Sequence, residues 1–223
     1  MSALEPPGCS VEPRLRRAAA LGELAAALAH ELSNVHMVAT GNLELLLATE
    51  GVPPTPGALG KSRDAIWRGA EIMRTLMALA QSEEPGGGAR FAAVLGHVRL
   101  LLETKLKRQG LRIEEDLAEA PPVDLEPTVL ALGLYGLLLG LGEVGRRGVL
   151  SIRTRVFAGH LRCELALAGS AELVARMAEA APAEDGVLGR VDAGLACRAL
   201  LAAGAQVEVE PGGRLVVAIP LRG

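Results

Sequence analysis

Two stretches in the first third of the chain carry apolar residues at helical spacing. Between Pro13 and Thr49 the apolar positions follow at intervals of three and four: Leu21, Leu24, Leu28, Leu32, Val35, Ala39, Leu43 and Leu46. A similar rhythm follows at Leu59, Ile66, Ala70, Met73, Leu76, Met77 and Ala80. Such spacing places apolar side chains on one face of an α-helix. Because prolines and glycines interrupt the pattern at residues 51–57, we predict two helices in an antiparallel hairpin.

A hairpin of this kind has an apolar face that nothing within it can bury. Its first helix, at about 1.5 Å rise per residue, is expected to run on the order of 50 Å. The usual solution for such a long hairpin is to pair with a second one. We therefore predict a homodimer built around a four-helix bundle.

The rest of the chain mixes helical and alternating patterns. Helices are expected at residues 91–107 and 126–144, with two more Ala-rich helices after residue 167. Strands are expected at residues 112–117, 149–157, 161–167, 206–210 and 214–220. This order predicts an α+β fold, with helices over one face of a mixed sheet in a two-layer sandwich. The predicted divisions are a tail at 1–12, the hairpin domain at 13–83, a linker at 84–90 and an α/β domain at 91–223.

Composition narrows the functional classes. The chain has 223 residues and a net charge of -3, so it has no overall basic field and nucleic acid is not an expected partner. Its three cysteines, Cys9, Cys163 and Cys197, are scattered, which favours a reduced, cytoplasmic setting over a disulfide framework or a zinc site. The longest uncharged run, residues 127–142, is shorter than the roughly 20 residues of a membrane helix. We expect no membrane span.

The candidate chemistry lies in the first helix, at the segment Ala-His-Glu-Leu-Ser-Asn. His30 falls just off the apolar face and is expected to point outward. One imidazole nitrogen can attack a phosphoryl group while the other keeps its proton, and the carboxylate of Glu31 can support the positive charge that develops. Asn34 lies one turn further along the same side, where its amide can contact the phosphate. His30, Glu31 and Asn34 are therefore the predicted catalytic residues.

The outward side of the first helix continues beyond Asn34. Met37, Val38 and Gly41 extend it and are the predicted docking residues for a partner protein. A zinc-protease motif would need a second histidine where Asn34 stands, so we predict no metal ligands. An arbitrary exposed His-Glu pair on a helix is commonly no more than a solvated face, and the wider pattern is what favours chemistry here.

The segment around His30 resembles the dimerisation and phosphotransfer domain of bacterial sensor histidine kinases. In that family a phosphorylated histidine is followed by an acidic residue and, three residues later, by asparagine or threonine. His30, Glu31 and Asn34 match those positions. The kinases often have proline next, whereas this chain has Val35, so the helix is expected to continue without a bend.

The resemblance extends over most of the chain, because the second half follows the order of the kinase ATP-binding domain. The residues that bind nucleotide in that family are missing here. Gly136 and Gly140 stand where magnesium-holding asparagines would fall, and Leu165–Ser170 lacks the aspartate that reads adenine. The glycine-rich lid is reduced to irregularly spaced Gly186, Gly189 and Gly194. The resemblance therefore implies a degenerate ATPase-like domain that neither binds nor hydrolyses ATP.

These features together resemble the ChpT-type histidine phosphotransferases of bacterial phosphorelays. That resemblance implies that His30 shuttles phosphate between the aspartates of response regulator receiver domains. It implies no cofactor in this chain, because the magnesium ion belongs to the receiver. Two alternatives stay open: an ATP-dependent sensor histidine kinase core, and a dimeric docking scaffold that carries no phosphate.

Overall fold

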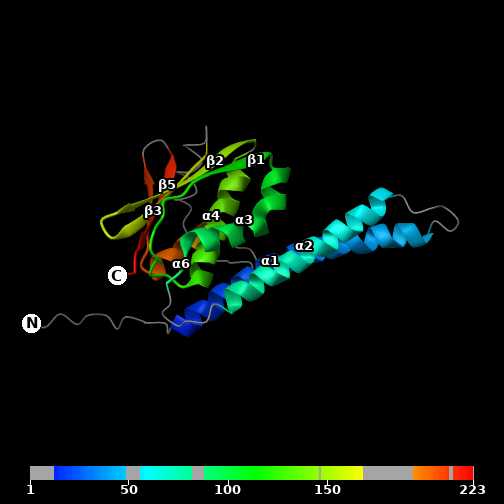
Figure 1. Cartoon of the computed structure of the whole chain (residues 1–223), viewed down its shortest axis with the longest axis horizontal. Coiled ribbons are helices and arrows are strands. Elements are labelled where there is room, and N and C mark those ends of the chain that lie inside the picture. The colour runs from blue at the N-terminus through cyan, green and yellow to red at the C-terminus, as the bar shows by residue number, and fades with distance from the viewer. Residues whose placement is uncertain are drawn as a thin grey trace, which may run out of the picture.

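The computed structural model describes residues 13–48, 56–81, 88–145, 147–167, 193–210 and 213–222. Over these residues the chain forms a long helical hairpin followed by a sheet with helices packed on it (Figure 1). The elements are α1 (Pro13–Ala48), α2 (Pro56–Ala80), α3 (Phe91–Arg108), β1 (Leu111–Asp116), α4 (Pro127–Val144), β2 (Gly148–Phe157), β3 (His160–Leu167), α6 (Ala193–Ala202), β4 (Gln206–Glu210) and β5 (Arg214–Pro220). The predicted α+β class, with a hairpin before a sandwich, is confirmed.

Helix α1 is unbroken through Val35, as expected where a proline is absent. It packs on α2 through Leu24, Leu28 and Ala39, which are buried. The residues of α2 that are buried against it are mostly small, and we call them the inner seam: Ala58, Ser62, Ala65, Ile72 and Leu79. The Oγ of Ser62 donates a hydrogen bond of 3.3 Å to the backbone oxygen of Ala39. Small side chains at this contact let the two helices approach closely.

The inner seam differs from the pattern predicted for α2. The predicted positions include four large apolar residues that lie one helical step away and are 46–58 % exposed in the chain: Leu59, Ile66, Met73 and Met77. We call these four the outer seam. Hydrophobicity alone favours the large side chains, whereas close packing against α1 selects the small ones. As a result, α2 carries one buried face and a second apolar face that this chain leaves uncovered.

The sheet has the strand order β1-β2-β3-β5-β4, in which β1 and β2 are parallel and the other neighbours antiparallel. The register aligns inward-facing residues, because Ile152 pairs with Leu165 and Leu165 pairs with Leu215, all of them buried. Ala158 and Gly159 join β2 to β3 with φ angles of 49° and 77°. Two successive positive φ angles fit a tight hairpin turn, as the sequence predicted there.

Helix α4 forms the centre of the molecule. It contacts α3, α6 and also α1, so nearly every residue of α4 is buried and one continuous apolar core runs from the sandwich into the hairpin. A helix that is apolar on all sides is expected where neighbours surround it. Arg16 of α1 strengthens the junction by donating a hydrogen bond of 2.9 Å to the Ala202 oxygen of α6. Within the hairpin, Arg17 of α1 donates to the Ala80 oxygen of α2 at 2.5 Å.

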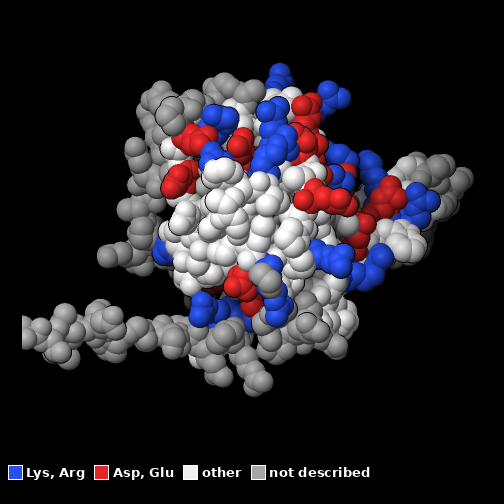
Figure 2. All heavy atoms as spheres, turned by 60° about the vertical axis from the view of Figure 1, so that its left-hand side comes forward, with Lys and Arg blue, Asp and Glu red and all other residues white. Residues whose placement is uncertain are grey.

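Surface charge is mixed. On the face drawn in Figure 2, Lys and Arg side chains alternate with Asp and Glu around an uncharged centre. On the side of the sheet away from the helices, Arg162 and Arg214 form ion pairs with Glu164 and Glu210.

Among the described residues, each helix is too short or too polar to cross a membrane.

Candidate functional site

His30 lies in the middle of α1 with its side chain exposed. The packed residues of α1 on either side of His30 explain this orientation. Leu28 is fully buried and Leu32 packs against the core, so a residue between them is turned toward solvent by the 3.6-residue repeat. The predicted outward placement of His30 therefore agrees with the structure, although its chemical role is not tested by it.

Glu31 and Asn34 are both half-buried near His30. Because α1 is continuous, His30 and Asn34 are four residues apart on the same side, whereas Glu31 lies about 100° further around the helix. Among the described residues no hydrogen bond links the three side chains. Their predicted catalytic roles remain predictions.

Helix α4 approaches the hairpin close to this site. The phenol of Tyr135 is buried, and its pKa is raised to about 12, first by burial and then by the negative charges of Glu31 and Glu143. Helix α4 contacts α1, the helix that carries Glu31. Tyr135 was not predicted as a site residue, because nothing in the sequence pattern indicated which side of α4 meets the hairpin.

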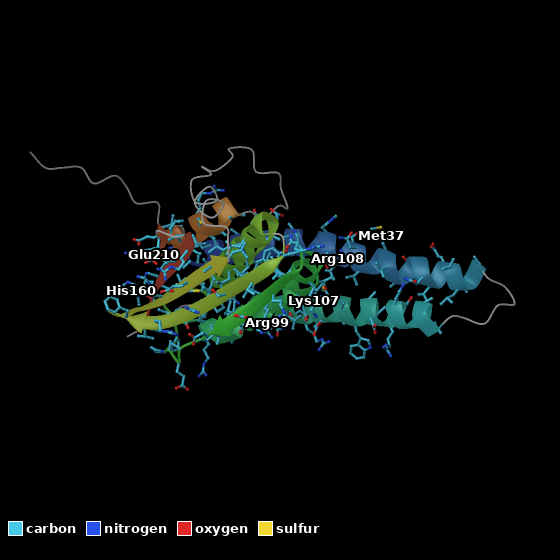
Figure 3. All side chains as sticks on the ribbon, turned by 90° about the horizontal axis from the view of Figure 1, so that it is seen from above. Met37, Arg99, Lys107, Arg108, His160 and Glu210 are labelled. Carbon is cyan, nitrogen blue, oxygen red and sulfur yellow. The ribbon has the colours of Figure 1, made fainter. Side chains whose placement is uncertain are left out.

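The predicted docking residues form an exposed strip along α1. Met37 is 61 % exposed and Val38 45 %, and a Cβ added at Gly41 would meet no atom within 4 Å. Figure 3 shows Met37 projecting away from α2. Leu45, 62 % exposed, continues the strip one turn beyond Gly41. Leu45 was not among the predicted docking residues, although its spacing of four from Gly41 is the pattern that places it on this strip.

The part of the sandwich that corresponds to the predicted nucleotide site is only partly described. Gly136 is buried inside α4 and Gly140 is half-buried, so neither position offers a side-chain ligand. Gly194 lies in α6. The predictions for residues 168–170, Gly186 and Gly189 concern positions outside the described residues. Within the described ranges, no three His, Cys, Asp or Glu side chains are grouped as metal ligands would be.

No family model and no curated protein matches the sequence. Solved structures do resemble it. A bacterial phosphotransferase is 16% identical with a TM-score of 0.54, over 92% of this chain and 96% of that one. The histidine kinase AdeS of Acinetobacter baumannii is 18% identical with a TM-score of 0.48, over 87% and 98%. The blue-light activated histidine kinase EL346 of Erythrobacter litoralis is 18% identical with a TM-score of 0.46, over 72% and 59%.

At such low identity, the likeness to the phosphotransferase shows the fold alone. The class defined here is a helical hairpin joined to an α/β sandwich, shared with that protein along nearly its whole length. Similar folds host different activities, so the function has to be argued from the residues of this chain.

Proposed function

We propose that the chain is a histidine phosphotransferase of a two-component phosphorelay. The observation that carries the proposal is the exposed imidazole of His30, in the His-Glu-x-x-Asn pattern, on a fold shared with a bacterial phosphotransferase. The substrates are phosphorylated receiver domains of response regulators. The chain itself needs no cofactor in this proposal.

The proposed reaction has two matched steps. A lone pair on one ring nitrogen of His30 attacks the phosphorus of an aspartyl phosphate, the bond from phosphorus to the carboxyl oxygen breaks, and the receiver's aspartate leaves as a carboxylate. The phosphoryl group then remains on His30 as a phosphoramidate until an aspartate of a second receiver attacks it. Magnesium held by the receiver neutralises the phosphoryl oxygens in both steps.

The neighbours of His30 have positioning roles in this proposal. The carboxylate of Glu31 offsets the positive charge that the ring gains during attack, and the amide of Asn34 donates to a phosphoryl oxygen. Met37, Val38 and Gly41 supply an exposed strip on which a receiver helix can lie. The strip begins one turn from Asn34, which would hold the receiver's aspartate within reach of His30.

We also propose that two chains form a homodimer through the outer seam. Leu59, Ile66 and Met73 recur at intervals of seven, which is the spacing of a helix packed along a partner helix. Because the inner seam already satisfies the contact with α1, this second seam is free to meet another hairpin. Large exposed apolar side chains in a continuous row are typical of a protein interface.

A reconstituted relay tests the catalytic assignment. We expect the variant His30→Ala to stop transfer from a phosphorylated receiver to a second receiver. His36→Ala is the matched control, since His36 is also exposed on α1 and its loss should leave transfer unchanged. Continued transfer by His30→Ala would leave only a docking role, and acid-labile labelling of His30 from ATP and magnesium would instead establish a kinase.

A further inference from the structure

A groove separate from the His30 strip lies between α2 and α3. It has a volume of about 560 Å³ and is lined by Trp67, Arg68 and Arg74 of α2 and by Glu103 and Lys107 of α3, among others. A second hollow of about 420 Å³ shares Glu103 and Lys107 and continues past Arg99 to Arg112 of β1. Figure 3 shows Lys107 and Arg99 along α3 on this route. The two hollows form one trough from α2 to the edge of the sheet.

The floor of the trough includes Arg68, which is held in place by a hydrogen bond to α3. Arg68 has a side chain only 14 % exposed, and it donates a hydrogen bond of 3.2 Å to the backbone oxygen of Leu101, which ties α2 to α3. The Nε of Arg68 is buried and has no partner within the described structure. A buried donor without an acceptor is costly, so a ligand or water that reaches it gains a hydrogen bond.

The trough is lined by more basic than acidic side chains. Its acidic residues already form ion pairs: Asp64 with Arg63 at 2.9 Å, Glu71 with Arg68 at 3.5 Å and Glu103 with Lys107 at 2.6 Å. Arg74 and Arg112 have no ion pair among the described residues. The Nε of Arg74 reaches only the Ala70 oxygen of its own helix, at 3.3 Å. Two guanidinium groups therefore remain available to an anionic partner.

Trp67 gives the trough an apolar contact at its rim. It is the only tryptophan in the chain and is 64 % exposed. Trp67 and Arg74 each follow an outer-seam residue, Ile66 and Met73, and therefore lie about 100° around α2 from that seam. A second chain on the outer seam would leave this side open.

We propose that the α2–α3 trough binds an acidic, extended segment of a partner protein. Its carboxylates would pair with Arg74 and Arg112, and an apolar side chain between them would cover the indole of Trp67. Tryptophan and arginine together are the residue types that contribute most to binding at protein interfaces. A nucleic acid carries a charge at every nucleotide and would have to pass Glu71 and Glu103, which line both hollows, whereas a peptide can place an uncharged residue beside them. This site is independent of the phosphotransfer at His30.

The lone tryptophan makes the test direct. The full chain is titrated with a short synthetic peptide of repeating Glu-Glu-Leu triplets while Trp67 fluorescence is recorded. We expect the fluorescence to change until the peptide saturates the site. The affinity should fall about tenfold as salt rises from ~0.05 to ~0.5 M, since exposed ion pairs are screened by salt. The variant Arg74→Glu should bind about tenfold more weakly. A Gln-Gln-Leu peptide should give no saturable change.

Arg153→Glu is the matched control. Arg153 is exposed on the sheet, and its replacement changes the net charge by the same amount as Arg74→Glu. Its affinity for the acidic peptide should equal that of the unmodified chain. Equal binding by Arg74→Glu, equal binding of the glutamine peptide, or no binding at low salt would each overturn the proposal. Tighter binding of a single-stranded oligonucleotide than of the acidic peptide would also overturn it.

Discussion

His30 and His36 are both exposed on α1, and their different positions around the helix separate their proposed roles. Six residues at about 100° each put His36 roughly 120° from His30. Only His30 is followed on its own side by an amide and an exposed apolar strip. Both residues are exposed histidines, so residue type and exposure do not distinguish their roles. Their positions around α1 do.

Gly41 offers a test of the docking strip at one position. The variant Gly41→Glu places a bulky charge where a receiver helix is proposed to lie, and we expect the rate of phosphotransfer to fall at least tenfold. The fold should tolerate the change, because no atom lies within 4 Å of an added Cβ. Replacing a glycine inside a helix should even stabilise the chain by about 0.5–1 kcal/mol.

The comparison variant is Gly22→Glu, which makes the same change on α1, also without contact to an added Cβ. Transfer rates measured with a phosphorylated receiver should be normal for Gly22→Glu. If Gly41→Glu also transfers at the normal rate, the receiver docks elsewhere. Thermal unfolding of both variants checks that neither has lost the fold.

The buried thiol of Cys163 should lower the free energy of unfolding at alkaline pH. Burial raises the pKa of its thiol from an ordinary value of 9.0 to about 12. The unfolded chain therefore releases this proton first, so the stability contributed by the neutral thiol is present below pH 9 and is lost as pH rises toward 12. Between pH 8 and 11, with reductant present, the unmodified chain should lose about 2 kcal/mol more than Cys163→Ala. Equal losses in urea titrations would contradict this assignment.

At the scale of the elements, α4 and α6 pack closely at Gly133. A Cβ at Gly133 would lie 2.5–2.7 Å from three carbon atoms of Leu200. We expect Gly133→Ala to destabilise the chain by about 1–3 kcal/mol through overpacking. Gly96→Ala, on the open side of α3, should be neutral or stabilising. Denaturant unfolding measures both, and an unchanged midpoint for Gly133→Ala would show that the helices can separate without cost.

The sequence predicted the elements well where local pattern decides them. The strands at 206–210 and 214–220 match β4 and β5, and the turn at Ala158–Gly159 is observed. The pattern failed on α2, where Ala58, Ser62 and Ala65 form the contact with α1 in place of the larger residues. Small residues carry little hydrophobic signal, so their selection depends on how closely the two helices approach.

At the scale of the whole molecule, the outer seam predicts the oligomeric state. Ile66→Glu combined with Met73→Glu should convert a dimer into a monomer, because it places two charges in the proposed helix interface. Light scattering during gel filtration gives the mass directly. Met37→Glu, on the strip beside His30, should leave the dimer intact. A dimer that survives the double substitution would show that the outer seam is not the interface.

The contact between hairpin and sandwich could not be predicted from the sequence. It depends on pairs far apart in the chain, such as Arg16 with Ala202, and on the side of α4 that carries Tyr135. The proposed division at residues 84–90 remains a prediction, since the apolar core continues from α4 into α1. The position of His30 was predictable because it depends on the register of one helix.

The most direct test of the central claim is to locate the phosphate. The purified chain is incubated with a phosphorylated receiver domain and analysed by mass spectrometry under mildly basic conditions, which preserve phosphohistidine. We expect one phosphoryl group, on the side chain of His30. Phosphate on another residue, or transfer to a second receiver with His30 never modified, would contradict it.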